Sequence, residues 1–477
     1  MKATVIGSGP NGLSAAITLA RAGAEVQVIE AQSTIGGGAR SMELTLPGFV
    51  HDHCSAIHPL AVGSPFFRDL PLGEHGLEWV HSRYPLAHPL DDGTAAVLHR
   101  SVTETGAALG ADGEAYSELM QPLVDRWELL AGEILQPLLH IPRHPWLLAR
   151  FGLLALRSAR GLASRFSSDA AQALIGGLAA HSFLSLEARG SASFALVLGM
   201  FGHAVGWPLP RGGAQRISDA LAAHLRALGG TIETGRAISS LDGLSAARAI
   251  LLDVTAWQVA RLARDRLPPR LQKALASFPH GPSVFKIDYA LDRPIPWKAE
   301  ACREAATIHL GGTFDEIASA ERDVSRGHVP ARPFVLLAQP TICDPSRAPA
   351  GGHIAWAYCH VPRGCALDMT GAIEAQIERF APGFARCVLA RHVSRPADLQ
   401  AGNANLDGGD ITGGACDLWH LLARPVASPN PYRLGHTHLY LCSSSTPPGG
   451  GVHGMCGYHA ARWSLRDGES FAMLHQQ

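Results

Sequence analysis

In the first 35 residues of the chain the apolar positions follow a strand pattern, then a helix pattern, then a strand pattern again. Residues 3–6 form a short apolar run, and the apolar residues between positions 11 and 22 recur at the spacing of one helix face. Gly23 ends this helix, and a second run over residues 25–30 places valines at alternate positions. The pattern predicts a β-α-β unit at the start of the chain.

The middle of the chain reads differently. From about residue 60 to 205 prolines and histidines are frequent, and residues 116–139 and 146–166 carry the periodicity of two long helices. No second β-α-β unit is recognisable in this stretch. We therefore expect it to belong to a separate substrate or cap domain.

The α/β pattern returns after residue 210, with a helix expected at 218–228 and a strand at 231–234. Strands interrupted by proline-rich turns are expected from 283 to 433. A strand at 439–442 then leads into a glycine turn and a last helix. The alternation predicts an α/β fold in which one domain is discontinuous.

The composition is that of a globular protein. Hydrophobic residues make up 47% of the 477 residues and charged residues 17%, which provides material for a large core. The formal net charge of -1, without blocks of like charge, gives no reason to expect nucleic acid as a partner.

The nine cysteines include no C-x-x-C pair, which disfavours a disulfide framework or a zinc ribbon and fits a reducing compartment. We find no targeting segment before the first strand and no long uncharged apolar stretch, so we expect a cytoplasmic protein without a membrane span.

The turn after the first strand is rich in glycine. Gly7, Gly9 and Gly12 give the spacing G-x-G-x-x-G between the strand and the helix. Such glycines permit a tight turn and bring backbone N–H groups and the helix N-terminus against a pyrophosphate. Glu30 ends the second strand, where a carboxylate can bind a ribose hydroxyl. The order of these elements predicts dinucleotide binding, and the alternative is a tight turn without a ligand.

A second glycine loop follows Glu30. Gly36, Gly37 and Gly38 precede Arg40. A nicotinamide-binding domain has no need of glycines here, whereas FAD is longer and its ribityl pyrophosphate passes this loop. Glycine permits the close approach, and an arginine can bind a phosphate oxygen. The loop favours FAD over NAD, and the alternative is an ordinary loop with a surface arginine.

A third glycine turn lies between the last strand and the last helix. Residues 449–451 are all glycine, and Val452, His453 and Met455 follow them. A helix N-terminus directed at the pyrimidine edge of a flavin would stabilise the negative charge of the reduced ring. The alternative is a glycine turn without a ligand.

These three motifs, in this order, resemble the phytoene-desaturase-like FAD-dependent oxidoreductases, a branch of the glutathione-reductase and amine-oxidase type of FAD fold. Within that branch the chain resembles the subgroup named after pyridine nucleotide-disulfide oxidoreductase domain-containing protein 2. The resemblance runs from Ala3 to about Leu465. Further matching stretches are LPGFVHD (46–52), GWPLPRGG (206–213), FKIDYAL (285–291) and HGMCGY (453–458).

Pattern and resemblance together predict a discontinuous Rossmann-type FAD-binding domain with an interleaved α+β substrate domain. The first is expected to comprise residues 1–60, 206–280 and 434–477, and the second residues 61–205 and 281–433. The resemblance implies that the first glycines meet the pyrophosphate of a non-covalently bound FAD and that the last turn faces the isoalloxazine. It also implies that Ile238, which follows the strand at 231–234, presents its backbone to adenine. The expected FAD contacts are Gly7, Gly9, Asn11, Gly12, Glu30, Gly36, Gly37, Arg40, Ile238, Gly451, Val452, His453 and Met455. Residues 51–53 are expected near the flavin as well.

Two features depart from the subgroup's pattern or name. No adjacent cysteine pair exists, so we do not expect dithiol chemistry, and Ser443 and Ser444 stand where relatives usually carry glycine. Only the motif at Gly7 opens a β-α-β unit, which disfavours a reductase that takes hydride from NADPH on a second Rossmann domain. Oxygen, a quinone or another molecule is the expected electron acceptor.

Polar residues near the expected flavin site are candidates for catalysis. His453 could accept a proton or bind the flavin, and Asp52 and Tyr458 are further active-site candidates. The alternative for each is packing or exposure to solvent. No metal site is expected, because the 24 histidines include no H-x-x-x-H with a carboxylate partner on a helix.

The stretch from Trp146 to Phe166 combines leucines with Arg150, Arg157, Arg160 and Arg165. Such a helix could rest on a membrane surface, so that the protein would be membrane-peripheral and admit an apolar substrate. The alternative is a core helix whose arginines reach solvent. The sequence carries no signal for an oligomeric state.

The expected chemistry is dehydrogenation of an apolar or polyene-like small molecule, with hydride transfer to flavin N5; this substrate class rests on the resemblance. Two alternatives stay open. One is a redox-neutral flavin-dependent isomerase, and the other is a non-catalytic binding protein on the FAD fold.

Overall fold

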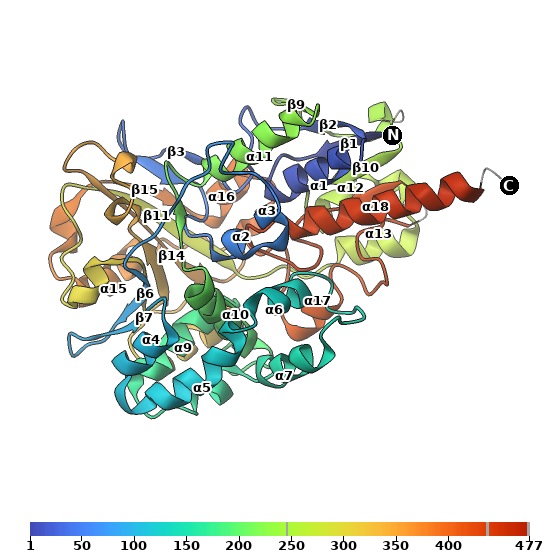
Figure 1. Cartoon of the computed structure of the whole chain (residues 1–477). Coiled ribbons are helices and arrows are strands. Elements are labelled where there is room, and N and C mark those ends of the chain that lie inside the picture. Colours follow the sequence, from blue (N-terminus) through green and yellow to red (C-terminus); the bar gives the residue numbers. More distant parts are fainter. Residues whose placement is uncertain (245–246, 436–437, 475–477) are drawn as a thin grey trace.

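A sheet of five parallel strands forms the first layer of the computed structural model, which describes residues 1–244, 247–435 and 438–474 (Figure 1). The strand order is β16-β10-β1-β2-β9, and every neighbouring pair is parallel. The strands are β1 (Lys2–Ile6), β2 (Glu25–Ile29), β9 (Thr231–Glu233), β10 (Ala249–Leu252) and β16 (Leu439–Leu441). Strands from three distant stretches of the chain therefore meet in one sheet, with β1 at its centre.

Helices cover both faces of this sheet, as the near-continuous apolar strands require. Leu13 and Ile17 of α1 pack with Val5 on one face, and Val259 of α12 packs with Ile250 on the other. The helices of this part are α1 (Pro10–Arg21), α11 (Gln215–Ala227), α12 (Ala256–Leu262), α13 (Pro269–Ala276) and α18 (Met455–Leu474). Figure 1 shows α18 running along α1 toward the C-terminus, near the N-terminal strand.

A second, mixed sheet has seven strands in the order β15-β11-β14-β13-β12-β6-β7, of which β12 and β6 are parallel. The strands are β6 (Tyr84–Pro89), β7 (Ala95–Leu98), β11 (Ser283–Leu291), β12 (Ala305–Leu310), β13 (Val335–Ala338), β14 (His353–Val361) and β15 (Val388–Ser394). Every residue of β11 is buried, because one face packs on Phe380 and its neighbours and the other packs on Phe183, Leu399 and Phe49. Two short pairs complete the strands: β3 (Ser41–Glu43) with β4 (Val50–Asp52), and β5 (Trp79–Val80) with β8 (Leu209–Pro210).

The remaining helices follow in two groups. The first is α2 (Pro59–Gly63), α3 (Pro65–Arg68), α4 (Val102–Ala108), α5 (Gly113–Val124), α6 (Trp127–Ile134), α7 (Pro145–Ala155), α8 (Ala159–Ala163), α9 (Asp169–Ala180) and α10 (Ser191–Ala204). The second is α14 (Phe314–Ser325), α15 (Thr370–Phe380), α16 (Pro396–Gly402) and α17 (Leu418–Leu422). The prediction of strands and turns over residues 283–433 was therefore incomplete, because it did not include the four helices of the second group.

The extents predicted for two long helices are wrong. The helix expected over 116–139 is divided into α5 and α6, because Arg126 has φ -127 and leaves the helical conformation. The helix expected over 146–166 is divided into α7 and α8. Ser158 lies between them and caps α8, because its side chain accepts a hydrogen bond from the Gly161 N–H at 3.0 Å. A serine side chain that binds a nearby backbone N–H favours the start of a new helix over the continuation of the previous one. The spacing of apolar residues does not reveal this effect.

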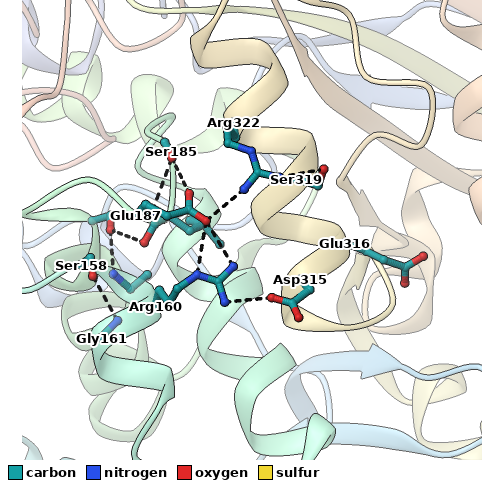
Figure 2. A network of polar contacts seen from close by, with 12 residues as sticks. Ser158, Arg160, Gly161, Ser185, Glu187, Asp315, Glu316, Ser319 and Arg322 are labelled. Atoms are coloured by element: carbon teal, nitrogen blue, oxygen red, sulfur yellow. Dashed lines mark hydrogen bonds and ion pairs between the residues drawn. The ribbon is translucent and has the colours of Figure 1, made fainter.

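Arg160 on α8 joins the helical part to α14 (Figure 2). It donates to Asp315 at 2.8 Å and to Glu187 at 3.2 Å, and Arg322 of α14 also donates to Glu187, at 3.3 Å. Each exposed pair contributes about 0.2–1 kcal/mol. The network therefore fixes the orientation of α8 on α14 more than it adds to stability.

The predicted α/β fold, with a Rossmann-type domain and a helix-covered mixed sheet, is confirmed. The domain boundaries at 60, 205, 280 and 433 stay predictions. The strands of the five-stranded sheet lie in the segments assigned to the first domain, and those of the seven-stranded sheet lie in the other segments.

Candidate functional site

The first glycine loop lies between β1 and α1, where two of its glycines have no room for a side chain. Gly7 has φ +98, and an added Cβ there would lie 2.8 Å from the Asp253 carbonyl oxygen. An added Cβ on Gly12 would lie 2.1 Å from the Gly7 carbonyl oxygen. Gly9 is the N-cap of α1, so the N-terminus of the helix lies at this loop. The loop has the form that binds a phosphate anion.

Glu30 lies directly behind this loop and is buried. One carboxylate oxygen accepts from the Ser8 N–H at 2.8 Å and from Ser8 Oγ at 2.7 Å, and the other accepts from the Gln32 N–H at 2.9 Å. The Arg236 N–H donates to the Glu30 carbonyl at 2.9 Å. This bond brings the segment after β9 beside Glu30, and Ile238 of that segment packs partly against the apolar core of the α12 face.

Asp253 follows β10 and reaches into the same loop. Its Oδ2 accepts from the Gly12 N–H at 2.9 Å. Burial raises the pKa of Asp253 from 3.8 to about 7, and the Glu30 carboxylate adds to this rise against the hydrogen bonds from the loop. Neither the strand β10 nor a role for Asp253 was predicted from the sequence, although the apolar run before Asp253 was an available signal.

Asn11 lies in the first turn of α1, one of the positions expected to contact FAD. It is 8% exposed, and its Oδ1 has no hydrogen-bond partner among the described residues. A buried polar atom without a partner costs free energy unless a ligand or water satisfies it. Asn11 is therefore placed to bind a group that enters the glycine loop.

The second glycine loop contacts the first. An added Cβ on Gly37 would lie 3.2 Å from Gly9 Cα, and the Gly36 N–H donates to the Ser8 carbonyl at 3.1 Å. Arg40 is buried and donates to the carbonyls of Gly37 at 2.8 Å and Gly402 at 2.7 Å. Two of its donors thus bind backbone, and the guanidinium stays next to both loops.

The C-terminal glycine turn leads into α18. Gly451 is exposed with φ +125, Val452 is half-buried, and Met455 is buried as the first residue of α18. His453 Nδ1 accepts from the Met455 N–H at 3.0 Å, and its carbonyl accepts from Ser64 Oγ at 2.6 Å. Burial lowers the pKa of His453 to about 4. Its imidazole is therefore neutral at neutral pH and caps the start of α18.

The turn is held against the first loop by the crossing of α1 and α18. An added Cβ on Gly457 would lie 1.8 Å from the Asn11 carbonyl oxygen, and one on Gly454 would lie 2.2 Å from Ser14 Oγ. The two helices touch through backbone at this point. Ser444, at the start of this turn, packs against Gly413.

Asp52 forms a buried ion pair. Its Oδ1 accepts from Ser41 Oγ at 2.6 Å and from the Ala214 N–H at 2.7 Å, and its Oδ2 accepts from Arg347 at 2.9 Å. Burial by itself would raise the pKa of Asp52, but Arg347 and these hydrogen bonds lower it. The carboxylate is thus fixed as an anion by protein donors.

Tyr458 lies on α18 beside Phe66, with ring centroids 5.1 Å apart. Its hydroxyl accepts from Arg462 at 3.2 Å, and the Arg462 guanidinium covers the ring at 5.4 Å. These contacts place Tyr458 on a partly exposed side of α18, whereas His453 is buried in the turn.

A buried lysine lies where β11 approaches the second loop. Lys286 is 3% exposed and pairs with Asp288, two positions further along the same face of β11. His51 Nδ1 lies 3.6 Å from Asp288 Oδ1. Burial, together with Lys286 and Arg347, lowers the pKa of His51 to about 3, so the histidine is neutral.

Cys54 lies near Lys286 and next to the second glycine loop. Burial raises the pKa of the Cys54 thiol to about 11, against the opposing effects of Lys286 and Arg40. An added Cβ on Gly38 would lie 3.6 Å from Cys54 Sγ. Residues 285–291 matched the subgroup, but no role was predicted for Lys286. A lysine and an aspartate at alternate positions of an apolar strand were the signal, because such residues are buried only when paired.

The structure brings most of the expected cofactor residues together. The hollow on its surface is lined by other residues. The two N-terminal loops, Glu30, Asn11 and Arg40 converge at one end of the parallel sheet, and the C-terminal turn packs on α1 beside them. A surface hollow of about 490 Å³ opens elsewhere, between α12 and α16. Among the described residues no group of three or more His, Cys, Asp or Glu side chains could hold a metal ion.

Comparison with known proteins agrees with this geometry. The model of a family described as NAD(P)-binding Rossmann-like domain matches residues 5–70. Pyridine nucleotide-disulfide oxidoreductase domain-containing protein 2 from Mus musculus and from Rattus norvegicus is 28% identical, over 98% of this chain and 93% of either relative. A limonene dehydrogenase subunit from Castellaniella defragrans is 33% identical over 24% of this chain and 21% of its own.

Solved structures share the fold. An oxidoreductase from Methanosarcina mazei has a TM-score of 0.64 at 18% identity, over 97% of this chain and 100% of its own. A triple mutant of putrescine oxidase has a TM-score of 0.62 at 18% identity, over 99% of this chain and 98% of its own. The chain is thus related over nearly its full length to pyridine nucleotide-disulfide oxidoreductase domain-containing protein 2, as the motifs predicted, and it carries a Rossmann-like dinucleotide-binding domain in a fold shared with amine oxidases.

Proposed function

We propose that this protein is a flavoenzyme that binds FAD non-covalently and dehydrogenates a largely apolar small molecule. The observation that carries the proposal is the convergence of three glycine segments around the N-terminus of α1. A nicotinamide dinucleotide needs the first of these loops, whereas the second loop and the C-terminal turn provide room for the longer FAD.

The residues present fit FAD. In the Gly7–Gly12 loop the Gly12 N–H is bound by Asp253, so a pyrophosphate would take the place of the Asp253 carboxylate there. The carboxylate of Glu30 lies where a ribose hydroxyl can replace one of its protein donors. Arg40 supplies a cation beside both loops. Asn11 Oδ1, which has no partner among the described residues, is available to a bound group. FAD would supply the acceptor for hydride, and the protein would orient the substrate.

The side of the seven-stranded sheet that carries Lys286 also favours an apolar substrate. On β14, Trp356 stacks on Tyr358 at 5.6 Å, and Tyr358 lies 5.7 Å from His360. Phe183 covers His360 at 4.1 Å. A row of rings binds apolar molecules with few polar contacts. The name of the partly similar limonene dehydrogenase also points to a hydrocarbon.

The Lys286–Asp288 pair is the group through which a substrate proton could leave. It is buried, carries both a donor and an acceptor, and lies beside the second glycine loop through Cys54. General acid–base groups of this kind contribute about 10²–10⁴-fold to a rate. His453 and Asp52 are weaker candidates, because the imidazole caps α18 and the carboxylate is held by Arg347.

The electron acceptor would be oxygen, a quinone or another small molecule. A flavin-dependent isomerase and a non-catalytic binding protein are the alternatives. The isomerase would turn over substrate without net electron transfer, and the binding protein would hold flavin without reduction by any substrate.

An absorbance spectrum of the purified protein tests the cofactor. Bands near ~375 and ~450 nm, with FAD released by heat and identified by mass, would support the proposal. Anaerobic bleaching by candidate apolar substrates would then test dehydrogenation. A colourless protein that does not take up added FAD would overturn it and favour the binding protein.

Replacing Glu30 with alanine is expected to weaken FAD binding by about ten- to a hundred-fold, because a charge-assisted hydrogen bond is worth about 1.5–3 kcal/mol. The dissociation constant can be measured by the quenching of flavin fluorescence. Glu25→Ala is the matched control, since Glu25 is an exposed acid at the other end of β2. Equal affinities of the two variants would show that Glu30 does not bind the cofactor.

The double variant Lys286→Met, Asp288→Asn should retain FAD but lose about 10²-fold in turnover, because it removes the proton-handling pair. Changing both residues avoids leaving one buried charge without its partner. Single-turnover reduction and flavin content are the measurements. Unchanged reduction kinetics would assign the pair a structural role.

A further inference from the structure

The outer face of α7 is apolar where a water-facing helix should be polar. Trp146, Ala149, Leu153 and Leu156 recur at helical spacing, and all are exposed. Trp146 is 87% and Leu153 76% exposed. The opposite face of α7 is also apolar, since Phe151 and Ala155 are buried in the core. Apart from Arg150, α7 is thus apolar on both its inner and its outer face, and an exposed apolar face of this kind favours a partner.

The loop before α7 extends the same surface. Leu139 is 65% and Ile141 94% exposed, which is more than for any other large apolar side chain except Trp146 and Leu153 among the described residues. Residues 139–156 thus present leucine, isoleucine and tryptophan side chains together. We refer to Leu139, Ile141, Trp146, Leu153 and Leu156 as the α7 surface. Figure 1 shows α7 at the edge of the helical part of the molecule.

Charge distinguishes the possible occupants of this surface. The chain has no aspartate or glutamate from residue 134 to 168, but five arginines in the same stretch. Arg143, Arg150 and Arg157 are exposed, and within the described ranges none of them forms an ion pair. Arg160 in contrast is engaged by Glu187 and Asp315 (Figure 2). Arg150 lies on the exposed face of α7, and Arg143 and Arg157 lie just before and just after the helix, so unpaired cations accompany the apolar side chains and match an anionic surface.

We propose that the α7 surface binds the interface of an anionic lipid bilayer. Its leucines and isoleucine would enter the boundary between head groups and acyl chains, and its tryptophan suits that boundary because one end of the ring is apolar and the other donates a hydrogen bond. The three unpaired arginines would face lipid phosphates. No helix within the described ranges is long and apolar enough to cross a membrane, so the contact is interfacial.

The experiment is flotation of the purified full chain with vesicles of phosphatidylcholine containing about 30% phosphatidylglycerol. The wild type is expected to float with these vesicles, and to float less with pure phosphatidylcholine or in about 0.5 M salt, which screens the arginines. The variant Trp146→Glu, Leu153→Glu should reduce the bound fraction about ten-fold. Both positions are exposed, so the fold is expected to persist, and circular dichroism checks this.

Leu367→Glu, Leu389→Glu is the matched control, because these leucines are 59% and 53% exposed but lie outside the α7 surface. It should float like the wild type. Absence of flotation for the wild type, or equal loss in both variants, would overturn the proposal. So would a dimer in sedimentation velocity that dissociates in the Trp146→Glu, Leu153→Glu variant without lipid, because the occupant would then be a second copy of the chain. These outcomes do not depend on flavin content.

Discussion

Replacing Gly457 with alanine is expected to lower the free energy of unfolding by about 3 kcal/mol, the upper range for forcing an extra group into a packed contact. The added methyl would lie 1.8 Å from the Asn11 carbonyl oxygen, 2.7 Å from its carbon and 2.9 Å from the Ala15 nitrogen. All three atoms are backbone of α1, so no side chain can rotate away. The helices must move apart, and urea unfolding measures the cost.

The same change should also weaken FAD binding, because α1 carries the first glycine loop at its N-terminus. Gly468→Ala provides the control on the same helix. Among the residues that the structure describes, its added methyl would meet only the Met1 sulfur, at 3.9 Å, so alanine should raise stability by about 0.5–1 kcal/mol through helix propensity. A stability loss shared by both variants would contradict the assignment of the effect to the α1–α18 crossing.

Asp253→Asn is expected to stabilise the protein increasingly as the pH rises from 4 to 7. The folded pKa of Asp253 is raised from 3.8 to about 7, by burial first and then by Glu30. Below the unfolded value both states are protonated and the group contributes nothing. Between the two values the unfolded chain releases the proton while the folded chain keeps it, so wild-type stability falls with rising pH.

The difference between the variant and the wild type should therefore approach the order of 4 kcal/mol near pH 7 and then level off. Asparagine retains an acceptor for the Gly12 N–H but does not ionise, which isolates the charge. Unfolding of the variant and of the wild type by urea from pH 4.5 to 8 provides the profile. A constant offset between Asp253→Asn and the wild type would refute the raised pKa.

The charges of Asp253 and Glu30 should also affect the affinity for the proposed cofactor. Two buried carboxylates lie within one glycine loop, and Asp253 occupies the Gly12 N–H that an anion would otherwise meet. A proton on Asp253 would remove one of the two negative charges before the pyrophosphate arrives. The pH profile of stability and the affinity for FAD are therefore two readouts of the same carboxyl group.

Local motifs were predictable from the sequence because the backbone alone constrains them. Gly7 and Gly12 are required by steric contacts with neighbouring backbone, whatever the remainder of the chain does. The β-α-β unit up to Glu30 follows from the periodicity of its apolar residues. The class of fold and the convergence of the two N-terminal loops could be deduced from these elements, since parallel strands place their carboxyl ends at one edge.

The groups that carry charge in the candidate site were decided by tertiary structure. Gly12 and Asp253 are 241 positions apart, and Asp52 and Arg347 are 295 apart. Periodicity does not reveal which buried acid meets which buried cation, because each pair forms only when separate sheets and loops pack. The breaks in the long helices likewise depend on local capping by Ser158 and on the backbone at Arg126. The sequence by itself thus determined the backbone cradle for a dinucleotide, whereas packing of distant segments decided its electrostatics, since the pKa of a buried carboxyl depends on neighbours that only the folded chain assembles.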